Sequence, residues 1–237
     1  MNAHRIAYAL AAASLAAALG GCATTQSTSA ADPLEPFNRA MYAIHEPIDR
    51  DIVRPFIRAY VDHVPSVIRT PISNFFNYVE DFFSGVNGLL QGKPDKAGHD
   101  FGRVMVNTFG LVGLIDFASE AGIPRGEEDF GQTFGVWGIP QGPYLFIPIL
   151  GPTTFRDGTG WIIRGFTTPV GYIPDVPLRN TLWGVGAVDL RAQALQAESI
   201  VGQAALDPYT FIRRAYLQRR RYLVYDGQPP PAKEDDE

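Results

Sequence analysis

Glycine and proline are unusually frequent in this sequence, and this limits the regular elements it can form. The 237 residues include 24 glycines and 19 prolines, whereas these two residues together make up roughly 12% of an average protein. Proline removes a backbone donor and kinks or ends a helix, and glycine weakens helices and strands alike. We therefore expect regular elements that are short or often interrupted.

The segment 122–186 concentrates this composition and still carries many large aromatic side chains, including Trp137, Trp161 and Trp183. A segment so rich in glycine and proline is typical of disorder. Large aromatics bury 150–250 Å² each as a rule of thumb, however, so we expect the segment to be ordered against protein or lipid. Its most apolar stretch, residues 144–150, is bracketed by Gly142-Pro143 and Gly151-Pro152. This pattern predicts a strand-like or hairpin excursion.

The N-terminus predicts export and lipid attachment. His4 and Arg5 precede an apolar run over residues 6–19, which is shorter than the roughly 20 residues that span a bilayer. The run ends in Leu19-Gly20-Gly21-Cys22, which resembles the bacterial lipobox. We therefore interpret residues 1–21 as a lipoprotein signal peptide and Cys22 as the lipid attachment site. The alternative is an ordinary signal peptide followed by a buried structural cysteine.

The residues after Cys22 favour a flexible, membrane-anchored connection. Several acyl chains on one residue give a stable anchor, where a single chain is marginal. Residues 22–32 are mostly small and polar, as in a flexible tether. Ala23 stands where an aspartate would favour retention in the inner membrane of many Gram-negative bacteria, which points to the outer membrane.

Apolar periodicity predicts helices through most of the remaining chain. From Ala40 to Val64 apolar residues recur every four positions, with kinks or breaks expected at Pro47 and Pro55. Residues 71–90 are expected to form a helix whose first turn holds Pro71. On that helix Asn74, Asn77, Asp81 and Ser84 are expected to face away from the packed side.

Three further helices are predicted. In the helix over residues 95–109, Phe101, Val104, Met105 and Thr108 are expected to point inward, and Gly110 to end the helix. Residues 187–205 form the second. The third runs from Asp207-Pro208, as cap and first residue, to about residue 225. We expect one helical domain over residues 33–227, followed by a disordered acidic tail over residues 228–237.

Catalytic and metal-binding signatures are missing from the sequence. The mature chain holds only His45, His63 and His99, in no metal-ligand spacing, and a single cysteine excludes an internal disulfide. We find no nucleophile elbow, phosphate-binding loop or dinucleotide fingerprint. The formal net charge of −5 lacks the cation excess that nucleic-acid binding needs. We therefore predict no enzyme, no cofactor, no metal and no nucleic-acid partner.

Two features remain open between packing and lipid contact. The chain has 17 arginines and only three lysines. Arginine can bind phosphate oxygens bidentately or simply pair with acidic neighbours. An apolar helix face can be core, or it can lie in the acyl region of a bilayer. The aromatic residues for which we keep both interpretations are Phe75, Phe76, Phe82 and Phe83.

An ordered series of short motifs runs through residues 32–225. The motifs include Asp32-Pro33-Leu34-Glu35-Pro36-Phe37-Asn38-Arg39, Ser73-Asn74-Phe75, Leu90-Gln91-Gly92, Gly113-Leu114-Ile115-Asp116, Asp129-Phe130-Gly131-Gln132-Thr133, Gly142-Pro143-Tyr144 and Asp207-Pro208-Tyr209. In this order they resemble the MlaA (VacJ) family of outer-membrane phospholipid-transport lipoproteins.

The resemblance implies an all-α, ring-like fold of amphipathic helices, anchored on the periplasmic side of the outer membrane of a Gram-negative bacterium. It also implies a non-enzymatic function. Phospholipids misplaced in the outer leaflet would pass through an amphipathic channel to a soluble periplasmic carrier, which maintains lipid asymmetry. A trimeric porin is the implied membrane partner. The alternative is a structural lipoprotein that stabilises porins without moving lipid. By analogy with the family, the candidates for a channel gate or lipid contact are Tyr144, Leu145, Phe146, Ile147 and Leu150.

Overall fold

The computed structural model describes residues 32–198 and 207–231. Cys22, the predicted tether before Asp32 and residues 232–237 lie outside this range. The elements in chain order are α2 (Glu35–Ile48), η2 (Asp49–Val53), α3 (Arg54–His63), α4 (Ser66–Leu90), α5 (Pro94–Phe109), α6 (Phe117–Glu120), α7 (Phe130–Val136), β1 (Tyr144–Ile147), β2 (Gly151–Thr154), α8 (Phe155–Thr167), η3 (Pro169–Tyr172), α9 (Val176–Glu198) and α10 (Pro208–Val224).

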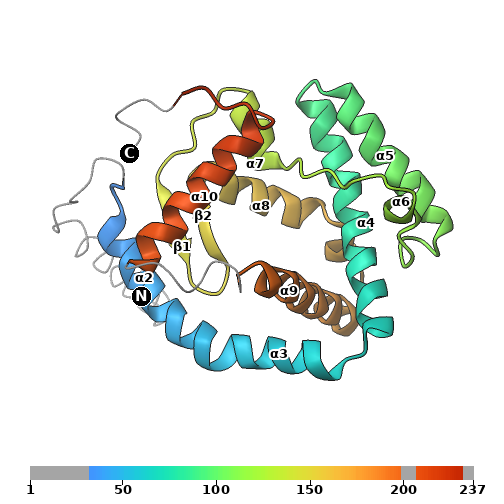
Figure 1. Ribbon diagram of the computed structural model, residues 1–237, viewed down its shortest axis with the longest axis horizontal. Coiled ribbons are helices and arrows are strands. Elements are labelled where there is room, and N and C mark those ends of the chain that lie inside the picture. Colours follow the sequence, from blue (N-terminus) through green and yellow to red (C-terminus); the bar gives the residue numbers. More distant parts are fainter. Residues whose placement is uncertain (1–31, 199–206, 232–237) are drawn as a thin grey trace, which may run out of the picture.

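The helices follow one another around a ring, as Figure 1 shows. Helices α2 and α3 form one side, α4 the next, and α7, α8 and α10 the side opposite α3. Helix α9 lies beside α3 and α4, and the antiparallel pair β1–β2 lies next to α2 and α10. The predicted all-α, ring-like fold with a small hairpin is confirmed.

The two prolines of the first side act as predicted, by interrupting an otherwise continuous helix. Pro47 lies inside α2, and the five residues that follow this helix form the π-helical turn η2 before α3 begins with Pro55 in its first turn. A π-turn commonly absorbs such an irregularity, because its hydrogen bonds reach one residue further along the chain. The chain therefore curves without a loop.

Helix α4 is longer than the composition suggested. It has 25 residues and begins at Ser66, so Pro71 lies inside the helix and the prediction of Pro71 in the first turn is wrong. The predicted N-terminus of α5 at Asp95 and its end before Gly110 agree with the structure within one residue. Helix α10 begins as predicted, because Asp207 caps it by accepting a hydrogen bond from the Thr210 N–H at 3.3 Å.

The region after the hairpin was predicted least well. Residues 155–167 form α8, whose first turn is capped by the Thr154 side chain, which accepts from the Asp157 N–H at 3.2 Å. Helix α9 begins at Val176, eleven residues before the predicted start. The last residues of that predicted helix, 199–205, lie outside the described range. Of the predicted tail, residues 228–231 are described, and Arg221 donates to the Pro230 carbonyl at 2.8 Å.

Candidate functional site

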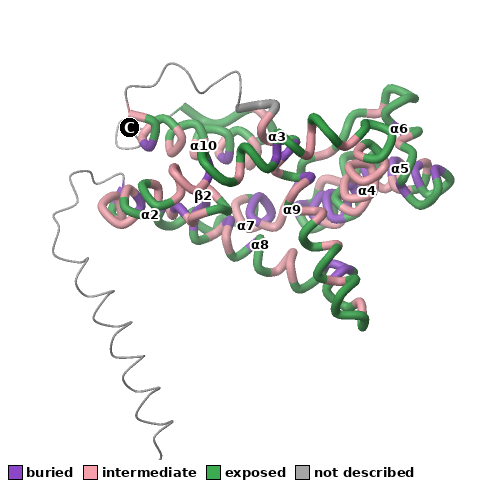
Figure 2. The backbone as a smooth tube through the Cα atoms, turned by 90° about the horizontal axis from the view of Figure 1, so that it is seen from below, coloured by how far each residue is buried: buried purple, intermediate pink, exposed green. Residues whose placement is uncertain are grey.

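Burial in this protein is reversed relative to a water-soluble domain. Within residues 32–198 and 207–231, nine hydrophobic residues are buried against nineteen polar or charged ones. Figure 2 shows the buried residues as short, scattered turns along the helices. All the largest fully enclosed side chains are polar, namely Arg103, Gln132, Asn38, Asn87, Thr133, Thr153, Thr154, Asp32, Asp81, Asp100 and Asp157. Such extensive polar burial is the informative departure from normal globular packing.

Large apolar side chains cover the outside instead. Soluble monomers expose few contiguous apolar patches, and larger ones mark protein or membrane contact. Three parts of the chain each carry four of them. They are Met105, Phe109, Leu111 and Val112 at the end of α5; Trp161, Ile162, Phe166 and Tyr172 on α8 and η3; and Val176, Leu178, Trp183 and Leu190 on α9.

The interface between α4 and α5 shows how polar residues come to be inside. Ser84 of α4 donates to Asp100 of α5 at 2.6 Å, and Asn87 of α4 also accepts a hydrogen bond from Thr133 of α7 at 2.8 Å. Glycine at position 88 permits the close approach of the two helices, because a Cβ there would lie only 3.1 Å from the backbone of Ala97. The prediction that Asp81 and Ser84 face away from the packed side is therefore wrong, since both are buried.

The inward face predicted for α5 is also partly wrong. Met105 and Thr108 are exposed, and the buried positions are Asp100, Arg103 and Asn107 together with Ala97. Asp100, Arg103 and Asn107 are three and four positions apart and therefore share one face of the helix. The helical periodicity was predicted correctly, but the buried face is the polar one. A hydrophobicity pattern distinguishes two faces of a helix but does not show which face packs against protein. The sequence-based prediction therefore assigned the wrong face of α5 to the inside.

Arg103 is the centre of this buried network. It is 0% exposed, and its guanidinium donates to Asp81 at 3.0 Å and to Asp116 at 3.0 Å. Arg125 approaches the other oxygen of Asp81 at 3.1 Å. Two carboxylates are thereby neutralised where an unpaired charge would be very costly. The network fixes α4, α5 and the start of α6 in one arrangement.

Asp116 predicts a pH dependence of stability. Burial alone raises its pKa, but hydrogen bonds from Ser119 and Asn107 and the charge of Arg103 outweigh burial and lower the pKa to about 2. Because the folded-state pKa lies below the usual 3.8, this stabilisation is complete above about pH 4 and disappears as the pH falls toward 2. We expect Asp116→Asn to lose about 1–2 kcal/mol at pH 6 and to show a smaller further loss below pH 4 than the parent. Urea unfolding at several pH values measures both, and parallel pH curves would contradict this assignment.

A second buried network joins α7, α8 and α10. Arg220 donates to Asp129 at 2.5 Å and to Asp157 at 3.0 Å, and the Tyr216 hydroxyl donates to Asp157 at 2.8 Å. Burial lowers the pKa of Arg220, but the neighbouring carboxylates of Asp129 and Asp157 outweigh burial, so the pKa is raised above its usual value. Gly131 is required at this junction, because a Cβ there would lie 2.5 Å from Asp157 Oδ1. Arg220 is therefore a structural cross-link between α7, α8 and α10.

Ion pairs and hydrogen bonds also tie α9 into the ring. Asp49 in η2 accepts from Arg191 of α9 at 2.8 Å and from Arg54 at 2.6 Å. On the other side, Ser73 of α4 donates to Asp189. Polar contacts thus hold helix α9 to η2 on one side and to α4 on the other. Sequence reasoning missed the contacts of α9 because Asp189 and Arg191 lie more than 100 residues along the chain from Ser73 and Asp49.

The hairpin residues named from the sequence fall into two groups. Tyr144 and Phe146 are 3% and 2% exposed and pack with Tyr209 in the one apolar cluster found among the described residues. Leu145 and Ile147 are half-buried, and Leu150 at the tip is 66% exposed. The hairpin thus has a packed base and an apolar outer end. The predicted role as a gate is not tested by this arrangement.

The base of the hairpin is attached to α2 through a side chain. Asn38 donates to the Tyr144 carbonyl at 3.0 Å and accepts from the Phe146 N–H at 2.9 Å. The side-chain amide of Asn38 thus forms the hydrogen bonds that a neighbouring strand would form with β1, at an edge whose backbone groups would otherwise be unpaired. At the tip, Ile149 has a φ of 72° and donates its N–H to Nδ1 of His45 at 3.1 Å. The tip is therefore held in a strained turn by one bond to α2.

The four phenylalanines predicted to pack or to face lipid also divide. Phe83 is 7% exposed and stacks against the guanidinium of Arg164, 3.7 Å from the ring centroid. Phe82, one residue along, is 46% exposed. Phe75 and Phe76 are half-buried, and Phe76 lies close enough to α9 that a side chain at Gly186 would clash with it at 2.9 Å. Phe83 thus fits the packing interpretation, whereas Phe82 is available for lipid.

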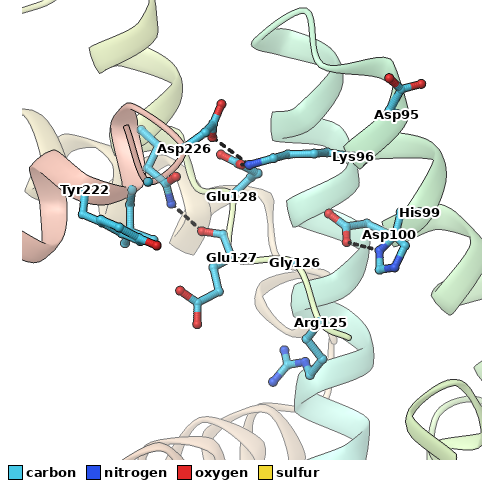
Figure 3. A pocket seen from close by; sticks show the side chains of 13 residues that line it. Asp95, Lys96, His99, Asp100, Arg125, Gly126, Glu127, Glu128, Tyr222 and Asp226 are labelled. Atoms are coloured by element: carbon cyan, nitrogen blue, oxygen red, sulfur yellow. Dashed lines mark hydrogen bonds and ion pairs between the residues drawn. The ribbon is translucent and has the colours of Figure 1, made fainter. Parts of the chain in front are cut away.

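A pocket lined by many charged residues lies between α5, α10 and the loop before α7. It has a volume of about 510 Å³ and is drawn in Figure 3. Lys96 contacts Glu128 and Asp226, each at 2.7 Å, and Arg125 is paired with Asp81. Because these cations already have carboxylate partners, we assign the pocket no ligand.

The described part of the chain holds neither a metal-binding cluster nor a membrane-spanning helix. No group of three or more His, Cys, Asp or Glu side chains there could hold a metal ion. No helix within residues 32–198 and 207–231 is both long and apolar enough to cross a membrane.

Comparison with known proteins gives consistent matches over nearly the whole chain. The family model described as MlaA lipoprotein matches residues 30–223. The intermembrane phospholipid transport system lipoprotein MlaA of Haemophilus influenzae is 36% identical over 92% of this chain and 91% of its own length. The protein of the same name from Escherichia coli K12 is 36% identical over 90% of this chain and 87% of its own.

A solved structure agrees with these relatives. It comes from work on the structural basis for maintenance of bacterial outer membrane lipid asymmetry. It superimposes with a TM-score of 0.70 at 35% identity and covers 81% of this chain and 98% of its own. The polar interior, the apolar exterior and the hairpin all lie within the matched region. The chain belongs to the MlaA lipoprotein family.

Proposed function

We propose that this protein is the lipoprotein of an intermembrane phospholipid transport system. It removes mislocalised phospholipid from the outer leaflet of the outer membrane, without breaking a bond, and so maintains lipid asymmetry. The reversed burial supports this proposal most strongly, because apolar exteriors and satisfied polar interiors suit a protein surrounded by hydrocarbon. The names of the relatives and of the solved structure are consistent with it.

The route proposed for the lipid is an amphipathic channel within the ring. A charged head group cannot cross hydrocarbon cheaply, whereas polar helix faces offer it partners. The exposed tip of the hairpin, Leu150 with its strained neighbour Ile149, is the proposed gate, and the buried Tyr144 and Phe146 are its fixed base. The proposed recipient is a soluble periplasmic carrier, and a trimeric porin is the proposed membrane partner.

A deletion strain tests this function against the scaffolding alternative. Loss of the gene is expected to increase surface-exposed phospholipid while porin abundance stays unchanged, and re-expression restores asymmetry. A scaffold predicts the opposite pair of results, with intact asymmetry and reduced porin. The purified protein is also expected to release no fatty acid from phospholipid, since the described residues show no converging catalytic set.

Attachment is proposed to occur through Cys22 after removal of residues 1–21, with residues 22–32 as the tether and residues 33–227 as a single domain. We expect Cys22→Ala to leave the chain uncleaved or unanchored and to abolish transport. The stability of the folded residues should not change, because none of them is altered. Membrane fractionation, a surface-phospholipid assay and thermal unfolding measure these three effects. Thr24→Ala, in the same segment, is the control that should remain anchored and active; an anchored, active Cys22→Ala protein would refute the placement.

A further inference from the structure

Helix α2 holds the hairpin through two side chains on one of its faces. Asn38 and His45 are seven residues apart, which is about two helical turns, so they lie in line along the helix. Asn38 accepts a hydrogen bond from the Phe146 N–H at 2.9 Å, and Nδ1 of His45 accepts one from the Ile149 N–H at 3.1 Å. The first acceptor is an amide oxygen, which does not titrate, whereas the second is an imidazole nitrogen, which does.

The bond at the tip fixes the protonation state of His45. A backbone N–H can only donate, so Nδ1 must present its lone pair and the ring proton must lie on Nε2. A second proton on the ring would occupy Nδ1 and turn this acceptor into a donor. Two donors would then face each other, and the bond would be lost. The His45 side chain is half-buried, so protons from solvent can reach it.

The turn that this bond holds has little other support. Ile149 has a φ of 72°, and a β-branched residue in this region is an outlier that persists only where its surroundings enforce it. Ile149 and Leu150 are 64% and 66% exposed, so packing contributes little there. Phe146 is enclosed and keeps its separate bond to Asn38. Loss of the His45 bond therefore frees the tip and leaves the base in place.

The charged groups around this junction are already paired with one another. The hairpin itself, residues 144–154, has no charged residue. The described pairs on the elements around it are Glu46 with Arg50, Asp49 with Arg54 and Arg191, Asp207 with Arg39, and Asp32 with Arg213. Burial raises the pKa of the hydroxyl groups of Tyr42, Tyr144 and Tyr209, so these stay neutral. An imidazolium at His45 would therefore gain little to compensate for the lost bond.

We infer that His45 is a pH-sensitive positioning residue for the hairpin: the neutral ring holds the tip against α2, and the protonated ring releases it. Because the bond requires the neutral ring, the held state is favoured at higher pH and is lost as the pH falls through the titration of the ring. The inference deepens the proposed gate and rests on it for any effect on transport. The contact itself can be tested without transport.

Hydrogen exchange at two backbone amides of the same hairpin tests the release. The lipidated chain is reconstituted in phosphatidylethanolamine and phosphatidylglycerol vesicles and measured between about pH 5 and about pH 8, the range in which histidine changes its charge. Each exchange rate is corrected for the intrinsic rate at that pH. Protection of the Ile149 amide should fall several-fold as the pH drops. Protection of the Phe146 amide, whose acceptor is Asn38, should stay constant.

His45→Asn is the matched variant, because the side-chain oxygen of asparagine can take the place of Nδ1 and accepts at every pH. Protection of the Ile149 amide in this variant should not change over the same pH range. His63→Asn is the control, since His63 is exposed and its Nδ1 contacts only the Ala59 carbonyl of its own helix, at 2.9 Å. This second variant should behave as the parent.

Three results would overturn the inference. The first is protection of the Ile149 amide that does not change with pH. The second is a parallel loss of protection at Phe146, which indicates general loosening of the hairpin. The third is a pH dependence that survives in His45→Asn. The first two are read from the parent protein, so the inference stays testable even where His45→Asn fails to fold.

Phospholipid transfer in the same vesicles separates this inference from the proposed function. Protection that depends on pH, in a protein that transfers no phospholipid, supports the role of His45 and contradicts the proposed function. Transfer by a protein whose Ile149 protection is independent of pH overturns only the role of His45.

Discussion

Replacement of Arg103 by methionine is expected to lower the free energy of unfolding by about 3–5 kcal/mol. Methionine fills most of the space but leaves the carboxylates of Asp81 and Asp116 without the guanidinium that each contacts at 3.0 Å. An uncompensated buried charge is far more costly than the loss of an exposed one. Urea unfolding of the detergent-solubilised protein, followed by circular dichroism, measures the effect.

Arg125→Met is the matched control for this prediction. Arg125 contacts the same carboxylate of Asp81 at 3.1 Å, but its side chain is 32% exposed. We expect a loss of no more than about 1 kcal/mol, as for other solvent-accessible pairs. Equal losses for the two variants would show that the buried network does not determine stability.

Phe146→Asp is expected to be as damaging, with a loss of about 3–5 kcal/mol. The Phe146 ring packs edge-on against Tyr42 and His45, with centroids 5.3 and 5.1 Å apart, and is almost fully enclosed. An aspartate there removes these contacts and buries a carboxylate. Thermal unfolding and retention of the hairpin in limited proteolysis report the change.

Leu150→Asp provides the paired substitution at the exposed end of the same hairpin. Because the side chain is 66% exposed, the stability change should be within about 0.5 kcal/mol. If the tip gates the channel or rests on lipid, surface-exposed phospholipid should still rise in cells. A stable Phe146→Asp protein, or a Leu150→Asp protein with unaltered lipid asymmetry, would contradict this division of the hairpin into base and tip.

Local signals in the sequence predicted several elements correctly. Asp207-Pro208 fixed the start of α10, Gly110 the end of α5, and the bracketing glycine-proline pairs the hairpin. These signals act within a few residues, through caps and backbone conformation. The ring-like arrangement was predicted only from the resemblance to the family. A closed arrangement depends on contacts such as Arg191 with Asp49, which no local pattern in the sequence reveals.

The polarity of the helices could not be read in the same way. The sequence placed Asp81 and Ser84 on one helix face with other polar residues, and that face was assumed to be exposed. In the structure these residues are inside, which is favourable only because each finds a partner on another element. Asp81 pairs with Arg103 and with Arg125, and these two arginines come from separate segments of the chain. Long-range charge complementarity of this kind identifies the inside of the fold, and a single sequence does not display it.

Transfer of intact phospholipid by the purified protein is the most direct test of a non-enzymatic phospholipid path through this ring. The lipidated chain is reconstituted in vesicles containing a phospholipid labelled on its head group, and a soluble lipid-binding acceptor is added. We expect labelled, unhydrolysed phospholipid to appear on the acceptor faster than from vesicles without protein, and Arg103→Met to abolish the increase. Transfer no faster than from protein-free vesicles, or release of free fatty acid in place of intact lipid, would contradict a non-enzymatic path for phospholipid through this protein.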